Sequence, residues 1–163
     1  MQKITLQKPE MMVTALKTRT SNAAEFNPET AKIGALMGVY FGGGLSQKIQ
    51  NRKNPGVTLS IYTEYESDHT GPYTYYLGEE TASFDSAPET FSSLTIPGQT
   101  YLKFTTHPGS LPEIVIDAWQ KIWAMTPQDF GAQRSYIADF ELYDARCADP
   151  SNAIVDIYIG LKS

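Results

Sequence analysis

The sequence contains few of the residues on which disulfides, metal sites and nucleic-acid binding depend. Its single cysteine, Cys147, has no partner for an internal disulfide, and a reducing cytoplasm is the expected compartment. The two histidines, His69 and His107, lie in turn-forming segments and lack the spacing of metal ligands. No block of Lys or Arg is present and the net charge is −5, which disfavours binding to phosphate backbones. We therefore expect no metal, no cofactor and no direct contact with nucleic acid.

Long apolar runs and common catalytic motifs are also absent. No apolar stretch reaches the roughly 18 residues that a membrane-spanning helix needs, and the first residues lack the features of a secretory signal. The chain has no G-x-S-x-G elbow, phosphate loop or dinucleotide-binding fingerprint, and no histidine near Cys147 to activate its thiol. With 41% hydrophobic and 19% charged residues over 163 positions, the composition is that of a globular domain.

The order of predicted elements is the same in both halves of the chain: strand, helix, strand, strand. Asn27 and Pro28 predict a helix start, and apolar residues then recur at helical spacing until Gly42-Gly43-Gly44 interrupts them. In the second half, Ser110 is the expected N-cap of an amphipathic helix. The first half should contain a strand at 9–20, a helix at 28–41, a helical piece at 45–50 and strands at 57–66 and 73–80. The second should contain a strand at 94–107 with a kink or turn at Pro97-Gly98, a helix at 110–125 and strands at 135–144 and 153–162.

The last two strands of each half also resemble each other in sequence. TEYE matches FELYD, and YTYYLGEE matches VDIYIGLK, which aligns Glu64 with Glu141 and Tyr76 with Tyr158. This agreement predicts an α+β fold of two β-α-β-β modules related by a pseudo-twofold axis, with helices packed on an antiparallel sheet. The chain is then one domain made of two repeats, at about 1–80 and 91–163.

Because side chains alternate along a strand, the residues of these strands divide between two faces. The residues of one face are apolar and are predicted to lie in the core: Val57, Leu59, Ile61, Phe140, Leu142, Val155, Ile157 and Ile159. The other collects tyrosines and acids: Tyr62, Glu64, Tyr76, Asp139, Glu141, Tyr143, Asp156 and Tyr158. Aromatic rings beside an unpaired carboxylate are typical of a site for organic cations. The alternative is that these residues form an ordinary solvent face, because tyrosine is common on exposed strands.

Several segments resemble the GyrI-like small-molecule-binding domain, the effector-binding domain of bacterial multidrug-sensing transcription activators. The resemblance lies in IYTEYESDHTGPYTYYLG (61–78), YLKFTTHPGSLPEIVIDAWQKIW (101–123), FELYD (140–144) and VDIYIGLK (155–162). It implies a groove for lipophilic, often cationic compounds. The helix-turn-helix of those activators has no counterpart here, because residues 1–20 already read as strand, and Gly160 stands where many members have proline. The chain therefore looks like a stand-alone member of the type encoded by mobile gene (integron) cassettes.

The resemblance also implies the residues that contact a ligand. Glu141 matches the buried glutamate that faces the ligand, Tyr158 the tyrosine of the last strand and Trp119 the tryptophan of the helix. Aromatic positions of the family match Tyr62, Tyr75 and Tyr76, and the internal alignment adds Glu64. We expect Trp123 to lie in the helix core, and Tyr65 and Tyr136 to pack at the surface or in the core and not to contact a ligand.

Two alternatives to simple ligand binding stay open. Some GyrI-like proteins are hydrolases, and Glu141 with Glu64 would supply acid and base if one carboxyl were kept protonated by burial. Others inhibit DNA gyrase, which would make this chain a protein-interaction module. The residues favour binding over catalysis, with no catalytic residue assigned. A homodimer or a separate regulator protein is the expected macromolecular partner.

Overall fold

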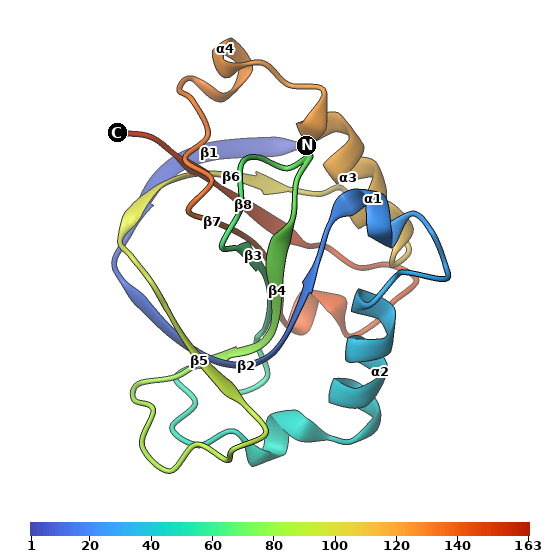
Figure 1. Cartoon of the computed structure of the whole chain (residues 1–163). Helices are drawn as coiled ribbons and strands as arrows, with labels where there is room; N and C mark the ends of the chain where they lie inside the picture. The colour runs from blue at the N-terminus through green and yellow to red at the C-terminus, as the bar shows by residue number, and fades with distance from the viewer.

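Eight strands form one antiparallel sheet in the computed structural model, which describes all 163 residues (Figure 1). The strands are β1 (Gln2–Lys8), β2 (Met11–Thr20), β3 (Thr58–Thr63), β4 (Tyr73–Glu80), β5 (Ser92–Ile96), β6 (Gln99–Thr105), β7 (Ala138–Tyr143) and β8 (Asp156–Leu161). The helices are α1 (Asn22–Glu25), α2 (Ile33–Gly42), α3 (Glu113–Trp123) and α4 (Pro127–Phe130), and the 3-10 turns are η1 (Leu45–Lys48) and η2 (Ala145–Cys147). None of these helices combines the length and hydrophobicity that a membrane span requires.

The strand order β1-β6-β8-β7-β3-β4-β2-β5 shows the internal symmetry. One module is β2-α2-β3-β4 and the other is β6-α3-β7-β8, and they join where β3 pairs with β7. The strand that precedes each module pairs with the other module. Thus β1, which precedes β2, pairs with β6, and β5, which precedes β6, pairs with β2. The predicted α+β fold of duplicated β-α-β-β modules is confirmed, whereas the residue limits of the two repeats stay a prediction.

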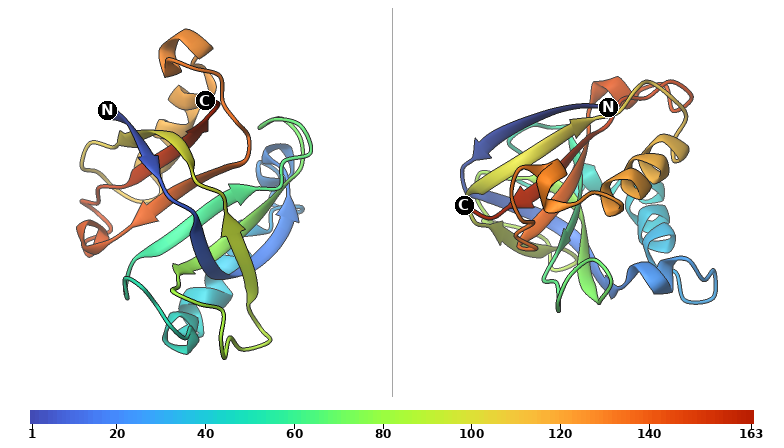
Figure 2. Two further views of the ribbon diagram at one scale, coloured as in Figure 1. Left: turned by 90° about the vertical axis from the view of Figure 1, so that its left-hand side faces the viewer. Right: turned by 90° about the horizontal axis from the view of Figure 1, so that it is seen from above.

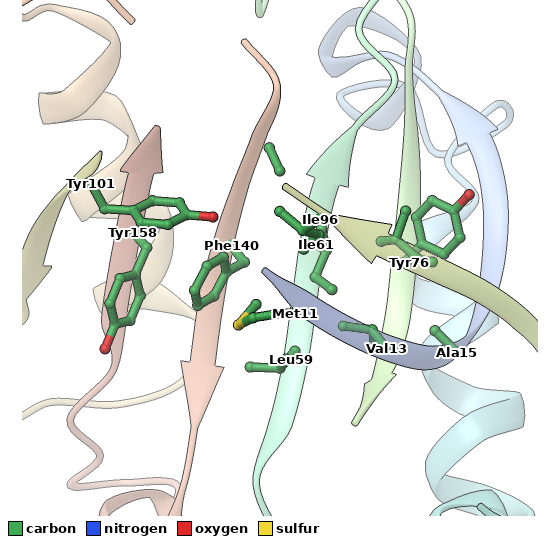
Figure 3. Packing of buried hydrophobic residues seen from close by; sticks show 12 residues of the cluster. Met11, Val13, Ala15, Leu59, Ile61, Tyr76, Ile96, Tyr101, Phe140 and Tyr158 are labelled. Atoms are coloured by element: carbon green, nitrogen blue, oxygen red, sulfur yellow. The ribbon is translucent and has the colours of Figure 1, made fainter. Parts of the chain in front are cut away.

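The sheet curls strongly, so that its inner face closes on itself and its outer face carries the helices (Figures 1 and 2). One apolar cluster fills the interior of the curl, with side chains from β2 to β8 such as Val13, Ile61 and Phe140 (Figure 3). A second cluster lies between α3 and strands β6 and β8, and a third lies under α2 and η1. Both faces of the central strands are therefore buried, and every residue of β8 is buried.

The boundaries of the first helix differ from the prediction. Asn27 does not cap α2: its side chain accepts a hydrogen bond from the backbone N–H of Glu29, and its carbonyl accepts from Ala31, which makes a turn after α1. The α2 helix begins instead at Ile33, and its first backbone donors are satisfied by the carboxylate of Glu25, which accepts from Lys32 and Ile33. A side chain from another helix caps α2, so local sequence alone placed the helix start too early.

The cap of α3 was also assigned to the wrong residue. The Ser110 side chain donates to the carbonyl of Ser151, and Pro112 occupies the N-cap position without a side-chain hydrogen bond. The buried residues of α3 are Val115, Ala118, Trp119 and Ile122, whose spacing is that of the predicted amphipathic helix. Residues 1–20, which were expected to be strand, form the two strands β1 and β2, whereas the short helices α1 and α4 were not predicted.

Candidate functional site

A cavity of about 520 Å³ lies on the outer face of the sheet, between α2 and α3, where the two modules meet. It is lined by 23 residues, of which 14 are hydrophobic. The helices contribute Ile33, Met37, Phe41, Val115, Ile116, Trp119, Gln120 and Trp123, and the central strands contribute Thr58, Ser60, Tyr62, Tyr73, Leu77, Glu141 and Tyr143. The cavity therefore lies at the junction of the two modules and has walls from both.

Glu141 is the buried carboxylate of this cavity. It is 2% exposed, and its Oε2 accepts hydrogen bonds from Tyr62 Oη at 2.8 Å and from Trp119 Nε1 at 2.7 Å. Its Oε1 accepts a short hydrogen bond from the hydroxyl of Tyr143. These donors come from β3, α3 and β7, so three elements of the fold fix the orientation of one carboxylate.

The charge of Glu141 is not balanced by any basic side chain. All three of its hydrogen-bond donors are neutral groups, and the structure contains no ion pair to it. Burial raises the pKa of this carboxyl above its ordinary value, although the hydrogen bonds from Tyr143, Trp119 and Tyr62 act in the opposite direction. A buried carboxylate in this state gains free energy from any cation that enters the cavity.

Asp139 provides an internal comparison on the same strand. It faces the same side of β7 as Glu141 and is fully buried, but its Oδ2 accepts from Arg134 Nη2 at 2.7 Å and from Tyr65 Oη at 2.6 Å. Its Oδ1 accepts from the backbone N–H of Gly160 at 2.8 Å. The chain thus supplies a cation to one buried acid of β7 and none to the other.

The pairing of the central strands explains why Glu141 borders open space. Ser60 lies directly opposite Glu141 in the β3–β7 register, and Tyr62 lies opposite Asp139. The small Ser60 side chain leaves room beside the carboxylate, and its hydroxyl shares a 2.8 Å hydrogen bond with that of Tyr75. The register therefore places one small and one aromatic residue of β3 along the floor of the cavity.

Aromatic rings form a connected wall from this floor to the rim. Tyr62 contacts the rings of Tyr73 and Trp119 edge to face, with centroid distances of 5.4 and 5.3 Å. Trp119 lies 6.1 Å from Trp123, which meets the ring of Phe26 edge to face at 6.3 Å. Phe26 is 72% exposed, so the wall ends in an apolar side chain at the surface. Two other exposed hydrophobic residues, Phe41 and Ile116, also line the cavity.

The structure brings together three of the seven predicted site residues, namely Glu141, Trp119 and Tyr62. Tyr75 does not line the cavity but lies behind it, fully buried, with its ring 5.4 Å from that of Tyr62. Glu64 is exposed, accepts a hydrogen bond from Tyr76 at 3.0 Å and does not line the cavity.

Tyr76 and Tyr158 were assigned to the wrong face of the sheet. Both lie in the interior of the curl, where Tyr158 stacks on Phe140 with centroids 4.4 Å apart (Figure 3). The strand pairs place Tyr158 opposite Phe140 and Tyr76 opposite Ile61, whereas Ile157 lies opposite Glu141. Because the sheet is buried on both faces, polarity does not tell which face of β4 or β8 carries the helices.

Several residues of the cavity were missed or taken for packing residues. Trp123 and Tyr65, which were expected only to pack, both line the cavity. Helical spacing of four residues from Trp119 would have placed Trp123 on the same face of α3. Tyr143, which alternates with Glu141 on the tyrosine and acid face of its strand, also lines the cavity. Alternation along the predicted strand places Tyr73 on the same face as Tyr75, whereas no signal in the sequence indicates Phe26 or Met37. No three His, Cys, Asp or Glu side chains are grouped as metal ligands would be.

Comparison with known proteins gives consistent matches over nearly the whole chain. Residues 5–161 match the family model of integron-associated effector binding proteins. A Bacillus subtilis (strain 168) protein named "Putative transcriptional regulator protein YobU" is 31% identical over 147 residues, which is 90% of this chain and 89% of that protein.

Solved structures agree with these sequence matches. The integron cassette protein VCH_CASS2 of Vibrio cholerae superposes with a TM-score of 0.75 and 28% identity, covering 98% of this chain and 95% of that one. SAV2435 bound to tetraphenylphosphonium has the same fold, with a TM-score of 0.75 and 16% identity over 100% of this chain and 95% of that one. The chain belongs to the integron-associated effector binding proteins, with the GyrI-like fold.

Proposed function

We propose that the protein binds lipophilic organic cations in the cavity between α2 and α3, with Glu141 as the counter-charge. The observation that carries this proposal is the contrast on β7. Two buried acids lie two residues apart, and only the one that faces the larger apolar cavity lacks a cation. A ligand that brings its own positive charge would complete the site.

The energetics favour a bulky cation with a delocalised or shielded charge. Such an ion loses little hydration on entering, and the aromatic wall attracts it through the ring quadrupoles. At a separation of ~6 Å and an effective dielectric constant of ~20, attraction to the carboxylate is worth about 3 kcal/mol. Contact with the apolar walls adds roughly 25 cal/mol for each Å² of apolar surface removed from water.

The comparisons support a role of this kind in regulation. SAV2435 has been solved with tetraphenylphosphonium, a lipophilic monocation, and the Bacillus subtilis relative carries the name of a transcriptional regulator. We infer that ligand binding changes how this protein acts on a separate partner protein. No contact with DNA is included in this proposal.

The test is a binding comparison between tetraphenylphosphonium and triphenylphosphine oxide, a neutral compound of related shape. Calorimetric titration should give saturable binding of the cation and much weaker binding of the neutral compound. Glu141→Gln should weaken cation binding by at least about tenfold, because loss of the charge removes more than 1.4 kcal/mol. Glu64→Gln is the matched control, since Glu64 is exposed and outside the cavity, and it should bind as the parent does.

Two results would reject the proposal. One is equal affinity for the cation and the neutral compound, and the other is unchanged cation binding in Glu141→Gln. The hydrolase alternative required a second carboxylate from Glu64, which does not line the cavity. Product formation from any bound compound would nevertheless restore that alternative, so the titrated mixtures should be checked for products by mass spectrometry.

A further inference from the structure

A second cavity, of about 420 Å³, adjoins the first on the side of α4. Its apolar lining is Ile122, Trp123, Met125, Pro127 and Phe130, and its polar lining is Ser67, His69, Gln133, Arg134, Ser135, Tyr136 and Lys162. His69, Trp123 and Arg134 belong to both linings, so these residues form the wall between the two cavities. One half of the second cavity is thus apolar and the other half is polar.

The polar half contains basic groups and no carboxylate. Neither an aspartate nor a glutamate lines this cavity, whereas Arg134 and Lys162 both do. Lys162 makes no ion pair, so its charge is free to attract an anion. This is the opposite of the first cavity, in which the buried charge without a partner is that of Glu141.

Arg134 is the buried element of this site. It is only 8% exposed, and its Nη2 donates to Asp139, but its Nε is buried without any hydrogen-bond partner. A buried guanidinium N–H without a partner costs free energy. The Asp139 pair neutralises the guanidinium overall, so Arg134 offers a directed donor and Lys162 offers the net positive charge.

Neighbouring rings hold this guanidinium in place. The Arg134 guanidinium lies over the ring of Tyr136 at 4.4 Å from its centroid, and the hydroxyl of Tyr136 is 3.0 Å from His69 Nδ1. Tyr136 has a positive φ of 53°, a backbone conformation that a bulky residue adopts only when its surroundings fix it. The donor is therefore positioned before any ligand arrives.

We propose that the second cavity binds an organic carboxylate with an apolar body, held by Arg134 and Lys162. The carboxylate oxygens accept from Arg134 and pair with Lys162, and the apolar body lies against Trp123, Met125 and Phe130. This site does not involve Glu141, and it shares with the first cavity only the wall formed by His69, Trp123 and Arg134.

The experiment uses Trp123 as the reporter, because it lines the second cavity as well as the first, whereas Trp119 lines only the first. In a Trp119→Phe background, Trp123 is the only tryptophan, and its fluorescence is followed during titration with sodium benzoate at constant ionic strength. Benzamide is the neutral control of the same shape. We expect saturable binding of benzoate and about tenfold weaker binding of benzamide, the factor that a hydrogen bond to a charged group supplies.

Two variants test the named residues. Lys162→Met should weaken benzoate binding by about tenfold and leave tetraphenylphosphonium titrations unchanged. The double variant Arg134→Gln with Asp139→Asn removes both charges of the buried pair together, so that neither is left alone, and it should also weaken benzoate binding. Circular dichroism should show that both variants are folded before their affinities are compared.

The proposal would be overturned by the absence of saturable benzoate binding, by equal binding of benzoate and benzamide, or by unchanged benzoate affinity in both Lys162→Met and the double variant. Loss of benzoate binding in Glu141→Gln would also overturn it, because that residue lies only in the first cavity. The proposed cation site is tested separately, so failure at one cavity leaves the result at the other intact.

Discussion

Asp139 and Glu141 are two buried acids on the same face of β7, and the guanidinium of Arg134 lies 2.7 Å from Asp139 whereas no cation contacts Glu141. The two residues therefore differ in role despite their identical chemistry and similar burial. Asp139 is part of an internal ion pair that joins β7 to the segment before it. Glu141 is held by neutral donors beside an apolar cavity, where a ligand can reach it.

This difference predicts opposite effects on stability. Asp139→Asn leaves a buried guanidinium without its counter-charge and should lower the free energy of unfolding by about 3–5 kcal/mol. Glu141→Gln removes a buried charge that has no partner, and its amide can still accept from Tyr62 and Trp119 and donate to Tyr143. Its free energy of unfolding should equal or exceed that of the parent. Urea denaturation at pH 7 measures both, and a larger loss in Glu141→Gln than in Asp139→Asn would contradict this interpretation.

Cation binding should depend on pH through Glu141. Burial raises the pKa of this carboxyl, and a bound cation favours its ionised form, so the bound state has the lower pKa. Affinity for tetraphenylphosphonium should therefore be constant above the pKa of the free protein and fall below it, by up to about tenfold per pH unit. Calorimetry in buffers of different ionisation enthalpy would detect the linked proton. Glu141→Gln should show no such slope, and a slope retained there would assign it to another group.

The element order and the central acid of the site were predictable because they leave local signals. Alternation along β3 and β7, the helical stripe of α3 and the sequence match between the two halves all result from short-range periodicity. Glu141 interrupts an otherwise apolar and aromatic strand, which makes it conspicuous. The expected face was right for Tyr62 because α2 and α3 cover that side of the sheet.

Other features depend on contacts between residues far apart in the sequence. Tyr158 was misplaced because β8 is buried on both faces, so its register is fixed only by pairing with β7. The start of α2 was misplaced because Glu25, from the preceding helix, satisfies its first N–H groups. The second cavity is lined largely by residues of irregular segments such as Ser67 and Gln133, which have no periodicity to read.

Gly78 should tolerate no side chain, because two strands meet too closely there. A Cβ at this position of β4 would lie 2.1 Å from the carbonyl oxygen of Thr14 and 2.6 Å from Cα of Ala15, both atoms of the β2 backbone. Backbone atoms cannot move aside without breaking the β2–β4 pairing, so Gly78→Ala should cost about 3 kcal/mol or more. Thermal denaturation measures the loss, and a change within ~0.5 kcal/mol would show that the strands can separate.

Gly38 provides the opposite case in the middle of α2. A Cβ there meets no atom within 4 Å, and the residue is exposed. Gly38→Ala should therefore raise the free energy of unfolding by about 1 kcal/mol, because alanine loses less conformational entropy in a helix. The same denaturation experiment measures the gain. A loss of stability would indicate that α2 departs from regular helical geometry at this position.

Phe26 should slow the escape of a bound cation without contributing much to folding. Its ring is 72% exposed and touches Trp123 at the rim of the first cavity, so truncation removes little buried surface from the free protein. Phe26→Ala should change the free energy of unfolding by less than ~0.5 kcal/mol. A ligand that rests against this ring loses about 1–2 kcal/mol of contact, so tetraphenylphosphonium should dissociate roughly tenfold faster in stopped-flow measurements. Ile4→Ala is the control, because Ile4 is similarly exposed on β1 and lies outside the cavity. Equal dissociation rates in the two variants would mean that the ligand leaves by a route that does not pass Phe26.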